Sequence, residues 1–257
     1  MEPAGLIEAL VGCAEEIDLA VREVSDWRAQ GNRPGQYRID VAADAVGVQY
    51  LTERGFGVLS EESGVHFAER ELFAVIDPID GSTNASRNLP WYATSICVLD
   101  PSGPLAAVVI NQASKVRYEA VRGDGALRNG THIAPSATQT LNHAIVGLSG
   151  YPEMHLGWAQ YRALGAIALD LCAVAEGSLD AYLDCGENSH GPWDYLAAML
   201  ICQEAGATVL DVSGRDLVTR EYAGRRSPVA AGTAALAREL QTASLAAPKR
   251  HGARSYE

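Results

Sequence analysis

The sequence lacks any apolar run of the roughly 20 residues that a membrane-spanning helix needs. Its N-terminus also lacks a basic stretch followed by an apolar core and a cleavage site, so no leader peptide is indicated. Lysine is scarce, because only Lys115 and Lys249 occur among the twenty basic residues, a bias that points to no function. These absences argue against a membrane protein and predict a location in the cytoplasm.

Cysteine is too sparse and too irregular to organise the fold. The chain has five cysteines, an odd number, and no two show Cys-x-x-Cys spacing. A disulfide framework or a zinc site is therefore not expected. Most of the cysteines stand in apolar surroundings, which predicts buried thiols.

Positive charge is in deficit. The formal net charge is −12 and the isoelectric point is about 4.9. Such a surface disfavours nucleic acid or an anionic membrane as the main partner. An anionic substrate would need local neutralisation, for which metal ions are suited. With 257 residues and 47% hydrophobic content, the chain predicts one large domain or two intimate halves.

Two carboxylates, a glycine and two hydroxyls gather within eight residues, Asp77–Asn84. An apolar run at residues 72–76 precedes them and predicts a buried strand, which Pro78 is expected to end. Ser82 and its two successors favour the start of a helix, whose free N–H groups can bind an anion. Acids beside an anion cradle would repel the anion, so the segment suggests a divalent metal that bridges protein and phosphate. The alternative is a solvated turn.

Other acids stand near the ends of predicted elements. Asp40 and Asp44 are four residues apart on a helix predicted over 39–52, so they share one face. For Asp40 we expect a solvated acidic face. Glu61 and Glu62 follow a short predicted strand and repel each other unless they are solvated or share cations.

Strands and helices alternate along the chain, which predicts a layered α/β (α+β) protein with mixed sheets. The segment Ala134–Ser136 is the predicted seam between an N-terminal half, 1–135, and a C-terminal half, 136–257, of one compact unit. The last ten residues are polar and are expected to be disordered.

Three segments together resemble the inositol monophosphatase family of Mg²⁺-dependent, lithium-sensitive phosphomonoesterases. Gly57–Gly64 is similar to the first acidic motif of that family. Asp77–Asn84 with Trp91–Val98 is similar to the main signature, and Trp193–Ala197 with Glu204–Gly206 to the second. The resemblance implies an αβαβα sandwich of the sugar-phosphatase type, in which two mixed sheets have intervening helices and the site lies between two halves.

The resemblance also implies a set of metal ligands. Glu61, Asp77 and the backbone carbonyl of Ile79 would hold a first Mg²⁺. Asp77, Asp80 and Asp194 would hold a second. Oxygen-only ligands suit Mg²⁺ or Mn²⁺ rather than zinc. Two divalent ions about 4 Å apart can each stabilise one end of an in-line phosphoryl displacement.

Further roles carry over from the same family. Gly81, Ser82 and Thr83 are similar to its phosphate-cradling turn. Asp44 is expected to pair with the hydroxyl of Ser82 and to orient the attacking water. Glu62 is expected to support a third, weaker metal or to hold the metal shell in place.

The resemblance also implies which residues bind the leaving group. Gly165, Ala166 and Asp184 resemble family residues that contact substrate hydroxyls. For Asp184 a strand-end surface acid is an equal alternative. The loop Cys185–Pro192 is longer than the common pattern and is expected to border the pocket.

These observations predict a phosphatase for inositol monophosphate or a related cyclitol or sugar phosphate, with a small phosphorylated polyol as substrate. Alternatives with the same chemistry are histidinol phosphate, fructose 1,6-bisphosphate and 3′-phosphoadenosine 5′-phosphate. A non-catalytic regulatory relative should have lost a metal ligand, whereas all the carboxylate ligands are present here. Family members are commonly dimers, so a homodimer is expected.

Overall fold

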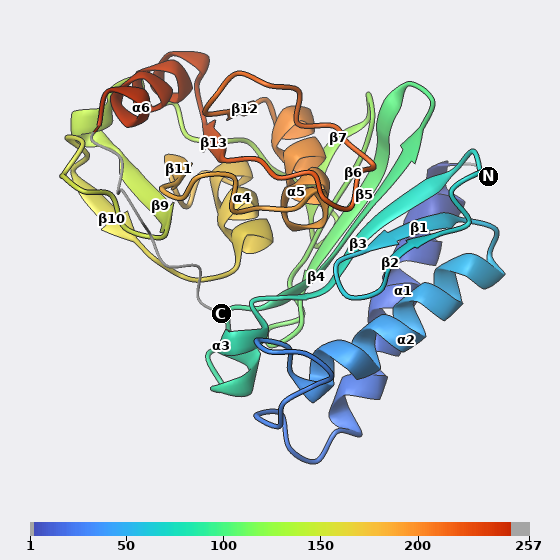
Figure 1. Ribbon diagram of the computed structural model, residues 1–257. Helices are drawn as coiled ribbons and strands as arrows, with labels where there is room; N and C mark the ends of the chain where they lie inside the picture. The colour runs from blue at the N-terminus through green and yellow to red at the C-terminus, as the bar shows by residue number, and fades with distance from the viewer. Residues whose placement is uncertain (1–2, 248–257) are drawn as a thin grey trace.

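Two sheets alternate with three helical layers in the computed structural model, which describes residues 3–247 (Figure 1). From one side to the other, the layers are α1 with α2, an eight-stranded sheet, α4 with α5, a five-stranded sheet, and α6. The predicted αβαβα sandwich is therefore confirmed. The ten C-terminal residues that we expected to be disordered lie outside the described residues.

The first sheet is built from the N-terminal part of the chain in the order β2-β1-β3-β4-β5-β6-β7-β8. Only β1 and β3 pair in parallel, so the sheet is mixed. Its strands are β1 (Gly57–Ser60), β2 (Gly64–His66), β3 (Phe73–Asp80), β4 (Ala93–Asp100), β5 (Gly103–Asn111), β6 (Arg117–Val121), β7 (Gly125–Arg128) and β8 (Thr131–His132).

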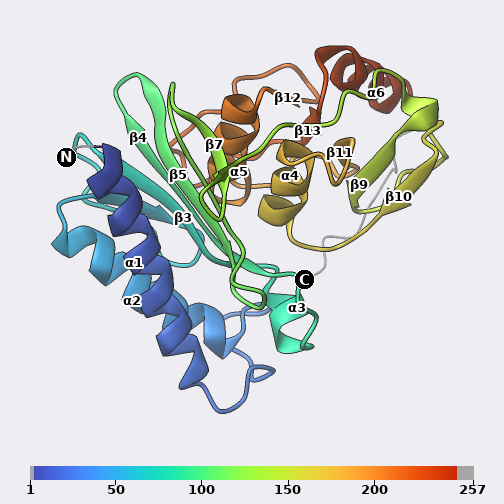
Figure 2. The ribbon, with the colours of Figure 1, turned by 180° about the vertical axis from the view of Figure 1, so that it is seen from behind.

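Helices α1 (Pro3–Arg22) and α2 (Arg38–Glu53) cover the outer face of this sheet, as Figure 2 shows from behind. Every third or fourth residue of α1 is apolar and buried, as in Leu6, Leu10 and Ile17. This spacing places one continuous apolar stripe against the sheet. The first helix ends at Arg22.

The second sheet follows in the order β10-β9-β11-β13-β12. Its strands are β9 (Ile145–Ser149), β10 (Gln160–Arg162), β11 (Ala181–Asp184), β12 (Thr208–Asp211) and β13 (Pro228–Ala231). A short 3₁₀ turn, η1 (Leu141–His143), precedes it, and α6 (Ala234–Ala246) packs on its outer side. The hydroxyl of Thr233 accepts a hydrogen bond from Leu236 N and so caps α6.

Helices α4 (Ile167–Ala175) and α5 (Pro192–Ala205) lie between the sheets. Their buried side chains form one apolar core with residues of β4, β5 and β11. The ends of strands from both halves are therefore held on a common rigid layer. A short helix, α3 (Ser82–Ser86), follows β3 directly.

The expectation that Pro78 ends its strand was wrong. Strand β3 continues through Pro78 to Asp80, with a register shift between Asp77 and Asp80. The last residue of β1, Ser60, pairs with Ile76, so beyond that point β3 is bordered by β4 alone. A proline is tolerated at such an edge because no ladder bond is required from its nitrogen.

Four of the cysteines are buried free thiols, as predicted, and Cys185 is half-buried. Burial raises the pKa of Cys13 and of Cys202 to about 12, which keeps both thiols protonated and unreactive. Among residues 3–247, no helix combines the length and the apolar character that a bilayer span requires.

Candidate metal and phosphate site

Three acids from three different elements meet at one point between the sheets. Glu61 directly follows β1, Asp77 lies in β3, and Asp194 lies in the first turn of α5. One carboxylate oxygen from each lies within 4.8 Å of the others. The geometry therefore brings together residues that are more than one hundred positions apart in the chain.

The remaining predicted metal ligands line the same pocket. Asp80 and Ile79 border a cavity of about 220 Å³ together with these three acids. Asp77 Oδ1 accepts a hydrogen bond from Ile79 N at 2.9 Å. Asp80 Oδ2 accepts one from Ala168 N at 2.7 Å, at the start of α4. Backbone donors thus fix the orientation of both carboxylates, and the hydrogen bond to Asp80 joins the end of β3 to the start of α4.

The electrostatics of this cluster favour a bound cation. Burial, together with repulsion from Asp194 and neighbouring acids, raises the pKa of Glu61, Asp77 and Asp80 well above the ordinary range. The described residues bring no lysine or arginine to the pocket lining. A divalent metal ion would neutralise the cluster, and the oxygen-only donor set suits Mg²⁺ or Mn²⁺. The residues present therefore fit the expected metal.

The turn after β3 depends on Gly81. Its φ is +84°, a left-handed conformation that glycine adopts without strain. A Cβ at this position would also lie 3.0 Å from the Cβ of Ala166 and 3.1 Å from the carbonyl oxygen of Gly165. Gly165 and Ala166, which we predicted to contact substrate, therefore line the pocket against the turn that carries Ser82.

The side chain of Asn84 fastens this turn to the second half. Its Nδ2 donates hydrogen bonds to the carbonyl oxygens of Trp91, at 2.8 Å, and Leu164, at 2.7 Å. Thr83, by contrast, is exposed and its hydroxyl lies 3.4 Å from that of Tyr37. Of the predicted phosphate-binding residues, Gly81 and Ser82 line the pocket and the Thr83 side chain lies outside its lining.

Two neighbouring acids on α2, Asp40 and Asp44, are both buried, and neither has the surroundings that we expected for it. Asp44 Oδ1 accepts hydrogen bonds from the hydroxyls of Ser60 and Ser63, so it supports the strand end before Glu61. Asp40 is not solvated but 4% exposed, and its Oδ1 has no hydrogen-bond partner among the described residues. Burial raises its pKa, and the nearby Ser82 hydroxyl partly offsets this rise. The expectation of an Asp44–Ser82 pair is corrected accordingly.

Asp40 occupies the third position of α2 and is anchored there. Its Oδ2 accepts a hydrogen bond from Tyr37 N at 2.8 Å, which satisfies a free donor at the helix start. Burial, with repulsion from Glu62, raises the pKa of Asp40 from 3.8 to about 7. The sequence carried a signal for this, since an acid three residues into a helix commonly turns back to the first N–H.

Glu62 holds the neighbouring loops. Its Oε2 accepts hydrogen bonds from Arg33, at 2.7 Å, and from the amide nitrogen of Gln36. Burial nevertheless raises its pKa. From the second half, the hydroxyl of Tyr222 donates to the carbonyl oxygen of Glu61 at 3.0 Å. The first acidic motif is thus clamped from both sides, and sequence reasoning missed Arg33 and Tyr222.

Asp184 does not lie in the pocket lining. It is 2% exposed, and both carboxylate oxygens are occupied. Oδ1 accepts a hydrogen bond from Gly186 N at 2.9 Å, and Oδ2 accepts one from Ser189 Oγ at 2.6 Å. Its carboxylate therefore organises the long loop after β11. The burial of Asp184 rules out the surface-acid alternative, and its substrate-binding role stays a prediction.

His190, at the end of that loop, lines the pocket and was missed by sequence reasoning. Its Nδ1 lies 3.2 Å from Asp194 Oδ2, and its Nε2 lies 3.4 Å from the hydroxyl of Tyr182. Hydrogen bonding to Asp194, strengthened by the charges of Asp184 and Asp80, raises the pKa of His190 to about 9 despite its burial. It is a basic side chain that faces the acids.

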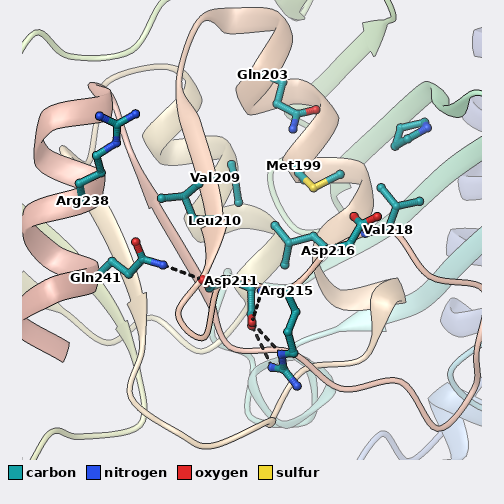
Figure 3. Close-up of a pocket in the computed structure, with 13 residues that line it drawn as sticks. Met199, Gln203, Val209, Leu210, Asp211, Arg215, Asp216, Val218, Arg238 and Gln241 are labelled. Carbon is teal, nitrogen blue, oxygen red and sulfur yellow. Dashed lines mark hydrogen bonds and ion pairs between the residues drawn. The ribbon is translucent and has the colours of Figure 1, made fainter. Parts of the chain in front are cut away.

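A larger hollow of about 510 Å³ lies elsewhere, between α5, β12 and α6 (Figure 3). Its acid Asp211 is already paired, because both oxygens accept hydrogen bonds from Arg215 at 2.8 and 3.0 Å. Gln241 Nε2 donates to the carbonyl oxygen of the same aspartate at 2.9 Å. The hollow's other acid, Asp216, accepts a hydrogen bond from Val218 N, and among the described residues no group of metal ligands is found here.

Comparison with known proteins agrees with this geometry. A model of the inositol monophosphatase family matches residues 36–250. The chain belongs to the inositol monophosphatase family. The match begins at Gln36 and so includes the helix that carries Asp40 and Asp44.

Individual members of the inositol monophosphatase family match over most of their length. A fructose-1,6-bisphosphatase/inositol-1-monophosphatase from Methanothermobacter thermautotrophicus is 34% identical over 218 residues, 76% of this chain and 78% of that protein. Nus factor SuhB from Salmonella typhimurium is 32% identical over 194 residues, 68% and 71% of the respective chains. A Pyrococcus horikoshii structure, described as having similarities to inositol-1 monophosphatase, matches with a TM-score of 0.85 at 24% identity and covers 94% of this chain and 99% of its own. The last comparison shows the shared fold.

Proposed function

We propose that this protein is a Mg²⁺-dependent phosphomonoesterase that hydrolyses inositol monophosphate or a related cyclitol or sugar phosphate. The observation that supports this most is the meeting of Glu61, Asp77 and Asp194 oxygens within 4.8 Å, in a pocket that Asp80 and Ile79 also line. Membership of the inositol monophosphatase family makes phosphatase chemistry the expected use of such a site.

The acids Glu61, Asp77, Asp80 and Asp194, with the carbonyl of Ile79, would hold two metal ions, and Glu62 would steady the loop beside them. Bound divalent ions supply charge neutralisation for the phosphate and for the developing charges of an in-line displacement. Mn²⁺ is a suitable substitute, since it accepts the same oxygen ligands.

The protein's own contribution to the attack is the pair Asp40 and Ser82. Asp40 Oδ1 is buried and has no hydrogen-bond partner among the described residues, and the nearby Ser82 hydroxyl partly offsets the rise that burial causes in the pKa of this carboxyl. In the proposed reaction this oxygen would accept the hydrogen bond of the Ser82 hydroxyl, and Ser82 would orient a water molecule toward phosphorus. A pKa of about 7 suits Asp40 to accept a proton near neutral pH. Gly81 lets the backbone of this turn approach the phosphate closely, because no side chain intervenes.

The size and charge of the pocket favour a small monophosphate. A cavity of about 220 Å³ has room for a phosphate and a compact leaving group. A second phosphate would find no lysine or arginine among the described residues of the lining. This disfavours fructose 1,6-bisphosphate and 3′-phosphoadenosine 5′-phosphate, and histidinol phosphate remains a monophosphate alternative.

The names of two relatives support second candidates. One relative is named for both fructose-1,6-bisphosphatase and inositol-1-monophosphatase activity, which keeps the bisphosphate as a runner-up. Another is named as a Nus factor, so the expected absence of a nucleic-acid partner is not carried into the proposal. The homodimer and the cytoplasmic location stay predictions.

Phosphate release, with and without Mg²⁺, tests the proposal across inositol 1-phosphate, other sugar and cyclitol phosphates, histidinol phosphate and the two bisphosphates. We expect Mg²⁺-dependent release, with a monophosphate of a polyol turned over best, and loss of release in Asp77→Asn. Release that persists in Asp77→Asn would contradict the site. Failure of every substrate despite demonstrated Mg²⁺ binding would overturn the phosphatase function and favour the non-catalytic alternative.

A further inference from the structure

Asp170 is a buried acid in the catalytic pocket that the predicted metal set does not use. It lies in the first turn of α4, is 1% exposed, and lines the pocket. Its Oδ1 accepts a hydrogen bond from Trp91 Nε1 at 2.8 Å. Its Oδ2 is equally buried, yet no described residue donates to it. An unpaired buried oxygen of this kind calls for a specific explanation.

The chemistry of the missing partner is restricted. A carboxylate oxygen only accepts hydrogen bonds, so the partner must carry an O–H or N–H group. Asp170 does not belong to the cluster in which Glu61, Asp77 and Asp194 approach one another, so the metal ions are not its obvious partner. When Asp170 is ionised, a phosphate oxygen is not a suitable partner either, because the two negative charges would repel each other.

The side chains around Asp170 fit a polyol. The pocket lining includes Ser149 and Tyr182, whose hydroxyls can donate or accept, and the imidazole of His190. His190 and Tyr182 line the same pocket as Asp170, and the hydroxyl of Tyr182 lies 3.4 Å from His190 Nε2. Asp184, the acceptor expected from the sequence, lies outside the pocket lining, and each of its oxygens already accepts one hydrogen bond from its own loop.

We propose that Asp170 Oδ2 accepts a hydrogen bond from a leaving-group hydroxyl, so that the enzyme selects phosphates of polyhydroxylated alcohols over phosphates of simple alcohols. This inference rests on the proposed phosphatase function and adds the recognition of its leaving group. Asp170 is a specificity residue, and it takes no part in the displacement at phosphorus.

A matched pair of substrates isolates the interaction. Glycerol 2-phosphate and isopropyl phosphate share a carbon skeleton and differ in two hydroxyls. We expect the wild-type kcat/KM to favour glycerol 2-phosphate by about tenfold to a hundredfold, the range for a hydrogen bond to a charged group. Asp170→Asn keeps an oxygen for Trp91 but replaces Oδ2 with a donor, so it should reduce this ratio at least tenfold.

Trp91→Phe is the control, because it removes the other hydrogen bond of Asp170 and leaves Oδ2 in place. It should preserve the ratio between the two substrates. Equal kcat/KM values of the wild-type enzyme for glycerol 2-phosphate and isopropyl phosphate would overturn the inference. The inference would also be overturned if both variants, Asp170→Asn and Trp91→Phe, lowered kcat/KM for the two substrates by the same factor. Asp170 would then serve only to hold Trp91 in place. A wild-type protein that releases phosphate from nothing in the earlier panel would instead overturn the proposed function, and this inference with it.

A measurement that requires neither metal nor turnover supplements the kinetics. Binding of myo-inositol to the metal-free protein, followed by tryptophan emission, should be seen in the wild type and lost in Asp170→Asn, with folding checked by circular dichroism. If Asp170→Asn is inactive with both substrates, the binding of myo-inositol decides whether Asp170 contacts the hydroxyls. Wild-type affinity in the folded variant would overturn the inference.

Discussion

Replacing Asp40 with asparagine should make the metal-free protein more stable while it impairs catalysis. Asp40 is 4% exposed, and burial with repulsion from Glu62 raises its pKa from 3.8 to about 7. Such a group destabilises the folded state whenever it is ionised. Asparagine removes the charge and keeps an oxygen that can accept the hydrogen bond from Tyr37 N.

The magnitude and its sign follow from linkage. Below pH 3.8, Asp40 is protonated in both the folded and the unfolded protein, so removing its charge does not change the free energy of unfolding. As the pH rises from 3.8 to about 7, the unfolded chain ionises first and the folded protein loses relative stability. Above the folded pKa the penalty is constant at about 4 kcal/mol, since each pKa unit corresponds to about 1.36 kcal/mol.

Urea unfolding in the presence of a chelator measures this difference. The free energy of unfolding of Asp40→Asn, minus that of the wild type, should grow by about 2–3 kcal/mol between about pH 5 and about pH 8. A difference that is flat, or that shrinks as the pH rises, would refute the reasoning. Mg²⁺ should be absent throughout, because a bound cation would compensate the charge.

Asp44→Asn, one helical turn away, is the matched control for the catalytic part. Asp40→Asn should lower kcat by about 10²–10⁴-fold, the range for a residue that handles a proton. Asp44→Asn should lower kcat less, because Asp44 contacts the hydroxyls of Ser60 and Ser63. The opposite ranking would return the water-orienting role to Asp44.

Two further predictions concern the metal cluster and the seam between the halves. Mg²⁺ at one hundred times its dissociation constant should stabilise the folded wild type by about 2.7 kcal/mol and so raise its thermal midpoint. The midpoint of Asp77→Asn should not rise. An equal rise in both proteins would contradict the ligand assignment. Asp180→Ala should lower the free energy of unfolding by about 1–3 kcal/mol near neutral pH, because Asp180 accepts hydrogen bonds from Ser136, Thr138 and Ile145 N. These bonds lower the pKa of Asp180, so the difference should fade in acid as the pH falls through its folded pKa; a difference that persists there, measured by urea unfolding, would count against this role.

Much of the metal site was predictable from local sequence. Glu61 follows β1, Asp80 ends β3, Asp77 lies three residues before that end, and Asp194 stands at a helix start. In layered α/β proteins such termini converge on one edge, so these residues could be expected to meet. The alternation of elements predicted a layered α/β protein with mixed sheets, and the resemblance to a known family added the αβαβα order and the ligand set. The prediction that Pro78 ends its strand was wrong, because a proline ends a strand only where a neighbouring strand needs a hydrogen bond from its nitrogen.

The sequence by itself determined which chemistry this pocket can hold, because the ligand types and their places at element ends are local properties. Tertiary structure decided which acid performs which role. Asp40 and Asp44 share one helix face, and only the packing of α2 against β1 and β3 sets Asp40 beside Ser82. Likewise, each oxygen of Asp184 accepts a hydrogen bond from its own loop, while Asp170 keeps one oxygen unpaired in the pocket. Which oxygen stays free depends on how the elements pack around each acid, and no local pattern in the sequence records that packing.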